Sequence, residues 1–233
     1  MVKKKSKKAK RTLRWNTKAI KPFVERSVKS LARKKRSVGP RSPWWIFLWD
    51  WPREFPKRLA CFMAGTYHFE PLQTYTFKDE TVTVWSYADR LFVRALLFLI
   101  KSSFKHIISS RCFHLKGPVG VGMALNSVMK ALTKGGFHYF MRIDISGYYA
   151  SIDRAILVKL TKKYFDDPIV LNYLEQIITI PIIQNGAVLN PQSGIPRRSS
   201  LSPFFGALYL DPLDKAFEKQ SGTCPLRQGS CRL

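Results

Sequence analysis

The sequence lacks a long uncharged apolar run and has few cysteines. Its longest apolar stretch, Leu91–Ile100, contains Arg94 and falls well short of the roughly 20 residues that a membrane-spanning helix needs. The four cysteines, at positions 61, 112, 224 and 231, have the spacing of neither a disulfide framework nor a zinc site. We therefore expect reduced thiols, a cytoplasmic location and no membrane partner.

Acidic residues are also scarce. The 233 residues include 15 aspartates and glutamates against 40 lysines and arginines, and 17 of those cations fall in the first 41 residues beside one acid, Glu25. Such an excess indicates a polyanionic partner, and we favour nucleic acid over an anionic membrane. We expect residues 1–42 to be a polybasic arm, disordered when free, that binds phosphates; a solubilising tail is the alternative. Its candidate nucleic-acid-binding residues are Lys3, Lys4, Lys5, Lys34, Lys35 and Arg36.

Apolar residues are plentiful after this arm. Hydrophobic residues make up 45% of the chain and aromatic residues 13%, which excludes a wholly disordered protein. Trp44–Trp49 marks the expected start of the folded part, with base stacking as the alternative use of its rings.

Gly117–Gly122 has the spacing GxxGxG and not that of the dinucleotide fingerprint. We therefore expect a turn with close backbone approach there, and no small-molecule cofactor.

Strand and helix signals alternate along the chain without a regular βαβ rhythm, which predicts an α+β fold. β-Prone runs predict a hairpin over 74–85, and Asn185-Gly186 predicts a second hairpin over 180–189. Ser86 is the expected N-cap of a long helix that ends near residue 109. The other expected elements are a strand at 137–145 and helices at about 123–133, 151–165, 168–179 and 199–219.

Two polar segments interrupt these elements. The first, Arg142–Asp153, places Asp144 at the end of the expected strand, and carboxylates at strand ends hold Mg²⁺ in phosphoryl-transfer sites. The second, Gly194–Pro203, is a Gly/Pro turn with two arginines that opens a serine-capped helix, which suits a phosphate-bearing ligand. Either segment alone is also compatible with an ordinary capped loop.

Together the two segments resemble the reverse transcriptase family, in particular its bacterial group II intron-like and retron-like enzymes. The segment with Asp144 resembles motif A, and Gly194–Pro203 resembles motif B, whose family form is Gly-x-Pro-Gln-Gly-Ser-x-Leu-Ser-Pro. Ser110–Gly117 is similar to the fingers region of one bacterial branch. The resemblance covers about residues 67–222, and it rests on the order and spacing of motifs A and B.

This resemblance implies a right-hand polymerase: a fingers-like region at 43–136, a partial palm with an incomplete antiparallel sheet at 137–222, an aberrant tail at 223–233 and no thumb. The implied ligands are Mg²⁺, an RNA template, a DNA primer and a dNTP. Asp144 is the implied catalytic and metal-binding carboxylate, helped by the carbonyl of Ile145, and Tyr149 closes the sugar pocket. The implied nucleotide-binding residues also include Pro196, Arg197, Arg198 and Ser199, and Lys116 is expected to contact nucleic acid.

The sequence departs from the family pattern at two places. Arg197-Arg198 replaces the Gln-Gly of motif B, and glycine in the second place permits close backbone approach to a nucleotide. An arginine there indicates impairment through a blocked pocket; pairing of Arg198 with a phosphate is the alternative. No aromatic-x-Asp-Asp segment follows motif B, and Glu218 is the one acid after Asp214. We interpret this as a frameshift or premature stop near Gly222.

Two other acidic positions have structural interpretations. Tyr164–Asp167 matches the missing string but precedes motif B, and Asp167-Pro168 is typical of an N-cap and first position of a helix. Asp153 is likewise expected to be an N-cap and not a metal ligand. We therefore expect an RNA-directed DNA polymerase that is inactive as this chain. The alternatives are a non-catalytic, maturase-like RNA-binding protein and a decayed mobile-element fragment.

Overall fold

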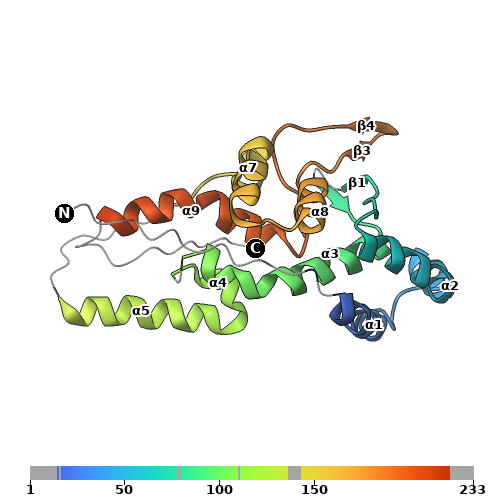
Figure 1. The fold of residues 1–233 in the computed structure, drawn as a ribbon, viewed down its shortest axis with the longest axis horizontal. Coiled ribbons are helices and arrows are strands. Elements are labelled where there is room, and N and C mark those ends of the chain that lie inside the picture. Colours follow the sequence, from blue (N-terminus) through green and yellow to red (C-terminus); the bar gives the residue numbers. More distant parts are fainter. Residues whose placement is uncertain (1–14, 16, 78–79, 110, 136–142, 221–233) are drawn as a thin grey trace.

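The computed structural model describes residues 15, 17–77, 80–109, 111–135 and 143–220. Helices dominate it, and a small mixed sheet joins them, so the prediction of an α+β fold is confirmed. Figure 1 shows α1 and α2 at one end of the molecule, with α5 and α9 extending toward the other end. The longer helices are α1 (Thr17–Lys34), α2 (Pro43–Ala64), α3 (Tyr87–Ile100), α5 (Gly120–Lys134), α7 (Arg154–Tyr164), α8 (Pro168–Ile178) and α9 (Ser202–Gln220). The short helices are α4 (Phe104–Ile107) and α6 (Tyr148–Ser151).

Both predicted hairpins are present in the sheet, whose strand order is β2-β1-β3-β4. Strands β1 (Leu72–Phe77) and β2 (Glu80–Val84) form the first, and β3 (Ile182–Gln184) and β4 (Ala187–Leu189) form the second. The second turns at Asn185-Gly186, which have φ of 51° and 80°, as a two-residue turn with two left-handed positions requires. Strands β1 and β3 pair in parallel, so the sheet joins the two halves of the chain.

An aromatic core holds α2, α3 and α8 together. The fully buried ring of Phe62 stacks on Tyr173 with ring centroids 4.7 Å apart and on Phe92 at 4.6 Å. The Tyr173 hydroxyl donates to the carbonyl oxygen of Phe62 at 2.8 Å, so its polar end is also satisfied. Burial raises the pKa of Tyr173 to about 12.

Helix α1 shows that the expectation of a disordered arm is wrong for residues 17–34. Ile20 and Val24 are fully buried, and Phe23 stacks on Phe98 of α3 with centroids 4.4 Å apart. The cations of this segment lie on the outer face of an amphipathic helix whose apolar stripe packs into the core. The folded part therefore begins before Trp44; residues 1–14, with Lys3, Lys4 and Lys5, lie outside the described residues.

The other expected elements have mixed outcomes. Ser86 caps α3, since its Oγ accepts the backbone N–H of Asp89 at 3.2 Å. Asp167 caps α8 in the same way, with bonds of 3.0 and 3.1 Å from the backbone N–H groups of Ile169 and Val170. Most of the strand expected at 137–145 lies outside the described residues, and Ile143–Ile145 are in no strand. Within the described ranges, no helix is long and apolar enough to cross a bilayer.

A buried carboxyl beside the first hairpin gives the protein a predicted pH dependence. Asp89 is fully buried, and its carboxylate accepts the hydroxyl of Tyr67 at 2.6 Å and the backbone N–H of Glu70 at 3.1 Å. Burial raises the pKa of Asp89 above its ordinary value, although these hydrogen bonds oppose the rise. The unfolded chain releases this proton at lower pH than the folded chain does. The contribution to stability is therefore present at low pH and is lost as the pH rises through the raised pKa.

We expect Asp89→Asn to remove this loss of stability at higher pH, because asparagine does not titrate. Its amide oxygen still accepts a hydrogen bond from one of the two donors, the Tyr67 hydroxyl or the Glu70 N–H. The stability of the variant relative to the parent protein should rise from pH 4 to pH 7, by about 1.4 kcal/mol for each unit by which the pKa is raised. Urea unfolding of both proteins across this range measures the difference. A difference that stays constant with pH would contradict the assignment.

Candidate functional site

The motif A and motif B segments lie against each other as an antiparallel pair. The backbone N–H of Ile195 donates to the carbonyl of Tyr149 at 2.9 Å, and that of Gly194 donates to the carbonyl of Ile152 at 2.7 Å. Asp153 and Ser193 form a further antiparallel bridge. Gly194 has φ of +82°, and a Cβ there would lie 3.2 Å from the carbonyl oxygen of Ala150. The glycine therefore serves both the turn and the close approach.

A buried arginine fastens this pair to the segment between α8 and β3. Arg154 begins α7 and is 6% exposed; its Nε donates to the carbonyl of Gly194 at 2.7 Å and its Nη1 to that of Ile180 at 3.0 Å. Burial lowers the pKa of Arg154, but an arginine stays charged at any ordinary pH. Nothing in the local sequence around Arg154 predicts these distant partners, so this residue was not among the predicted site residues.

Of the four predicted nucleotide-binding residues in the motif B turn, two are buried and two are exposed. Pro196 and Ser199 are buried, and their carbonyls accept hydrogen bonds from the Oγ of Ser202 at 2.5 Å and from its N–H at 3.3 Å. These bonds tie the turn to the start of α9. Arg197 and Arg198 are exposed at the tip of the turn. The turn is therefore held in place by hydrogen bonds from Ser202, and it exposes two cations to solvent.

Arg198, which stands where motif B has glycine, lies in the left-handed region of the backbone. Its φ is 65°, and it is one of two non-glycine residues with positive φ in the described part of the chain. A side chain in this left-handed region costs roughly 1–2 kcal/mol. The turn therefore carries a strained, exposed cation at this position.

We expect Arg198→Gly to raise the free energy of unfolding by about 0.5 to 1 kcal/mol, because relief of the left-handed strain outweighs the greater freedom of glycine in the unfolded chain. Urea unfolding at constant pH measures the gain. Arg198→Ala removes the same charge but keeps a Cβ, so it should bring no such gain. Equal gains in both variants would show that charge, and not backbone strain, is the cause.

The two tyrosines after motif A pack on α9. The Tyr148 hydroxyl donates to the carbonyl of Gly206 at 2.7 Å. A Cβ on Gly206 would lie only 2.9 Å from Cε1 of Tyr149, so the absence of a side chain at 206 makes room for that ring. Tyr149, the predicted sugar-pocket residue, is half-buried next to the motif B helix. Motifs A and B therefore meet through both backbone and side chains.

Comparisons with known proteins agree with this arrangement. The chain is 22% identical over 165 residues to the group II intron-encoded protein LtrA of Lactococcus lactis subsp. cremoris, and the same holds for the protein of strain MG1363. It shares its fold, at a TM-score of 0.52 and 18% identity over 86% of its length, with solved chains of a partial Cas6-RT-Cas1–Cas2 complex and of the Cas6-RT-Cas1–Cas2 complex. The resemblance to the reverse transcriptase family is confirmed.

The similarity to these reverse-transcriptase relatives covers a part of each of them. The matched region is 68% of this chain but 27% of LtrA, and the structural matches cover 34% and 21% of the two solved chains. No protein-family model matches the chain. The similarity shows a reverse-transcriptase-like fold here, and the activity of the whole relatives comes to this chain as a proposal.

Reverse transcriptases generally use divalent metal ions. We therefore compare the residues that the structure describes with the ligands that such ions need. Asp144 and Ile145 are exposed, and among the described residues no group of three or more histidine, cysteine or acidic side chains could hold a metal ion. Asp153 caps α7 through the N–H of Ile156 at 2.9 Å, as predicted. Asp167 caps α8, so the Tyr164–Asp167 string is structural, as predicted. These residues offer one carboxylate and not the set that a two-metal site needs.

The segment 111–117 contacts the motif B helix directly. His114 lies with Nε2 3.1 Å from the carbonyl oxygen of Pro203, just inside α9. Gly120 begins α5 where a Cβ would lie 2.2 Å from the carbonyl oxygen of Phe113. The close backbone approach expected over Gly117–Gly122 is present at Gly120 and not at Gly117 or Gly122, where a Cβ would meet nothing within 4 Å.

The predicted nucleic-acid-binding cations have different surroundings. Nζ of Lys116 lies 4.5 Å from the ring centroid of Phe113, which holds this side chain in place. Lys35 donates to the hydroxyl of Tyr87 at 3.4 Å and lies over its ring, so it also joins α1 to α3. Lys34 is exposed at the end of α1, and Arg36 lines a groove beside that helix.

Proposed function

We propose that this chain forms the fingers and part of the palm of an RNA-directed DNA polymerase, and that it binds an RNA template with its DNA primer but does not copy RNA by itself. In this proposal residues 43–136 are fingers-like and residues 137–222 are a partial palm. The observation that carries it is the pairing of Gly194 and Ile195 with the segment that follows Asp144. The family resemblance assigns nucleotide and metal to that junction.

Each predicted site residue has a role at this junction. Arg197 and Arg198 meet phosphates, because they are exposed cations on a turn that Ser202 fastens to α9. Tyr149 closes the sugar pocket, with α9 supporting its ring through Gly206. Pro196 and Ser199 are buried, so they shape the turn, and the nucleotide contacts the outer surface of that turn. Asp144 and the carbonyl of Ile145 provide one side of a Mg²⁺ site; among the described residues, no group of three or more histidine, cysteine or acidic side chains could hold a metal ion.

The proposal is tested by two measurements on the full chain. Binding of a labelled RNA–DNA primer–template is followed by fluorescence anisotropy between about 50 and 200 mM salt. We expect binding that weakens by about 10³-fold or more over this range, because contacts with several phosphates release counterions. We expect no primer extension with Mg²⁺ and dNTPs. Absence of binding at the lower salt concentration would overturn the proposal.

Asp144→Asn separates binding from chemistry. The variant should bind the primer–template as the parent chain does, since removing one exposed acid takes nothing from phosphate contacts. If the parent chain does extend primers and Asp144→Asn abolishes extension, then the chain is an active polymerase and the expectation of inactivity is wrong. Binding without extension in either protein also agrees with the non-catalytic RNA-binding alternative. An RNA-splicing assay would then decide between these two uses of the fold.

A further inference from the structure

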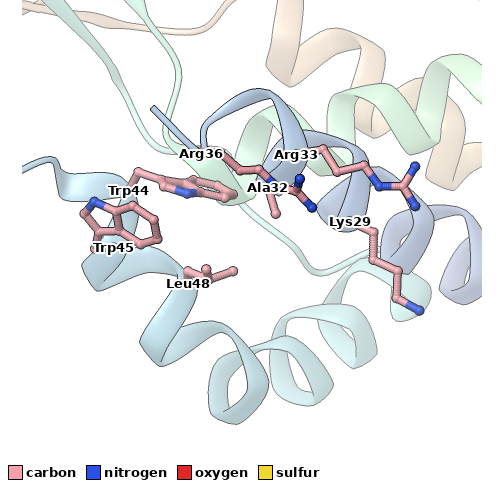
Figure 2. Close-up of a pocket in the computed structure, with 7 residues that line it drawn as sticks. All are labelled: Lys29, Ala32, Arg33, Arg36, Trp44, Trp45 and Leu48. Atoms are coloured by element: carbon pink, nitrogen blue, oxygen red, sulfur yellow. The ribbon is translucent and has the colours of Figure 1, made fainter. Parts of the chain in front are cut away.

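A groove of about 370 Å³ runs between α1 and the start of α2. Figure 2 shows its two walls: cationic side chains from α1 and the turn after it on one side, and large apolar side chains from α2 on the other. A groove of this size suits a nucleotide-sized ligand. The residues that line it are Lys29, Ala32, Arg33, Arg36, Trp44, Trp45 and Leu48.

Three exposed cations form the α1 wall: two from one face of the helix and one from the turn after it. Lys29 and Arg33 are four residues apart, which places them on the same side of α1, and Arg36 follows in the turn beyond Lys34. No acidic residue lines the groove, and across the residues that the structure describes none of the three cations forms an ion pair. Like charges at this spacing repel, so the arrangement suits an anionic ligand that bridges them.

The α2 wall offers an aromatic ring at a fixed position. Trp44 is buried beneath the groove, whereas Trp45 is 39% exposed, and its indole N–H donates to the carbonyl of Gly39 at 3.1 Å. This bond holds the ring without using its faces. An exposed tryptophan face next to clustered cations is the arrangement by which proteins bind single-stranded nucleic acid, with a base on the ring and phosphates on the cations.

We propose that this groove is a second nucleic-acid site that binds a single-stranded RNA segment, with phosphates on Lys29, Arg33 and Arg36 and a base stacked on Trp45. Its walls belong to α1 and α2, whereas the motif A and B junction lies on α6, α7 and α9. The two sites use different elements, so the groove goes beyond template–primer binding at the polymerase site. A flat anionic bilayer fits these walls less well, because it would contact outward residues such as Trp49 more than the floor of a groove.

The test compares a doubly substituted groove variant with a charge-matched control. Arg33→Gln/Arg36→Gln removes two groove cations, and Lys130→Gln/Lys159→Gln removes two exposed cations on α5 and α7. Binding of a labelled oligo-uridine of about ten nucleotides is measured by fluorescence anisotropy over a salt series. The groove variant should bind at least tenfold more weakly. The slope of log affinity against log salt concentration should fall by about one unit, since about 0.7 counterions are released per single-strand phosphate contact. The control should lose no more than about threefold.

Trp45→Ala tests the stacking contact separately. It should weaken oligo-uridine binding about tenfold with the salt slope unchanged, because base stacking releases no counterions. Circular dichroism and thermal unfolding of every variant check that these exposed substitutions leave the fold intact. Vesicles with about one third phosphatidylglycerol are the second probe.

The possible outcomes distinguish this inference from the proposed polymerase function. Equal losses in the groove and control variants would overturn the groove site and leave a uniform charge effect. Loss of vesicle binding with unchanged RNA binding would reassign the groove to an anionic membrane surface. In both cases primer–template binding that depends on Arg197 and Arg198 would still support the polymerase proposal. Loss of oligo-uridine affinity confined to the groove variants and Trp45→Ala supports the second site.

Discussion

Replacing Arg154 with methionine is expected to lower the free energy of unfolding by about 3 kcal/mol and to loosen the motif B segment. The guanidinium is buried and donates to the carbonyl oxygens of Gly194 and Ile180. Methionine fills much of the same volume but leaves both acceptors without a donor, and each such buried group costs about 1–3 kcal/mol. Because Gly194 pairs with the motif A segment, its release should also free the turn that carries Arg197 and Arg198.

Urea unfolding measures the loss, and limited trypsin digestion measures the loosening, since cleavage after Arg197 and Arg198 should become faster. Lys159→Met is the matched control: it makes the same kind of change at an exposed position of the same helix and should alter stability by less than about 0.5 kcal/mol. Arg154→Lys should fall between the two, because one ammonium group cannot reproduce the planar fork. Equal effects of the 154 and 159 methionine variants would contradict this role.

Local chemistry predicted most of the regular elements of this fold. Asn185-Gly186 tolerates the positive φ values that a tight hairpin needs, and the pairing of β3 with β4 follows from it. Ser86 and Asp167 cap their helices with side-chain oxygens, a bond that involves only the next three residues. These features depend on short stretches of sequence, so a single sequence is enough to identify them.

Two features of the fold could not be predicted in this way. The many cations near the N-terminus hid the apolar stripe of α1, in which Ile20 and Val24 are spaced four residues apart and are buried against the rest of the core. The parallel pairing of Leu72 with Ile182 joins residues far apart in sequence, and no local signal encodes such a register. Charge describes the surface of a segment, whereas burial depends on where the remainder of the chain lies.

In the candidate site, too, local sequence predicted some features and distant contacts determined others. The family resemblance assigned Tyr149 and the Pro196–Ser199 turn to the same bound nucleotide, and the structure pairs the backbone N–H of Ile195 with the carbonyl of Tyr149. The sequence also identified Arg198 as a departure from the family pattern, but its left-handed backbone conformation depends on the fold of the whole turn and has no signal in the sequence. Arg154 was missed, because an arginine at the start of a helix has no local feature that predicts two distant carbonyl partners.

The second large effect is expected from Phe204→Ala at the start of the motif B helix. Phe204 is 1% exposed and stacks on Phe104 with ring centroids 4.1 Å apart and planes 6° apart. It also meets Phe165 edge to face at 6.1 Å. Truncation of a buried phenylalanine leaves a cavity and costs about 3–5 kcal/mol, a large part of the 5–15 kcal/mol that stabilises a typical domain. Chemical denaturation of the parent and variant proteins measures the cost.

Phe217→Ala is the control for Phe204→Ala, since Phe217 lies on the same helix and is 46% exposed; its loss should cost below about 1 kcal/mol. Phe104→Ala and the double variant complete a cycle for the stacked pair. A coupling energy of about 0.5 to 1.5 kcal/mol is expected for rings in direct contact. Such a coupling would show that the segment before Ser110–Gly117 and the motif B helix unfold together. Additive losses would mean instead that each ring packs independently of the other.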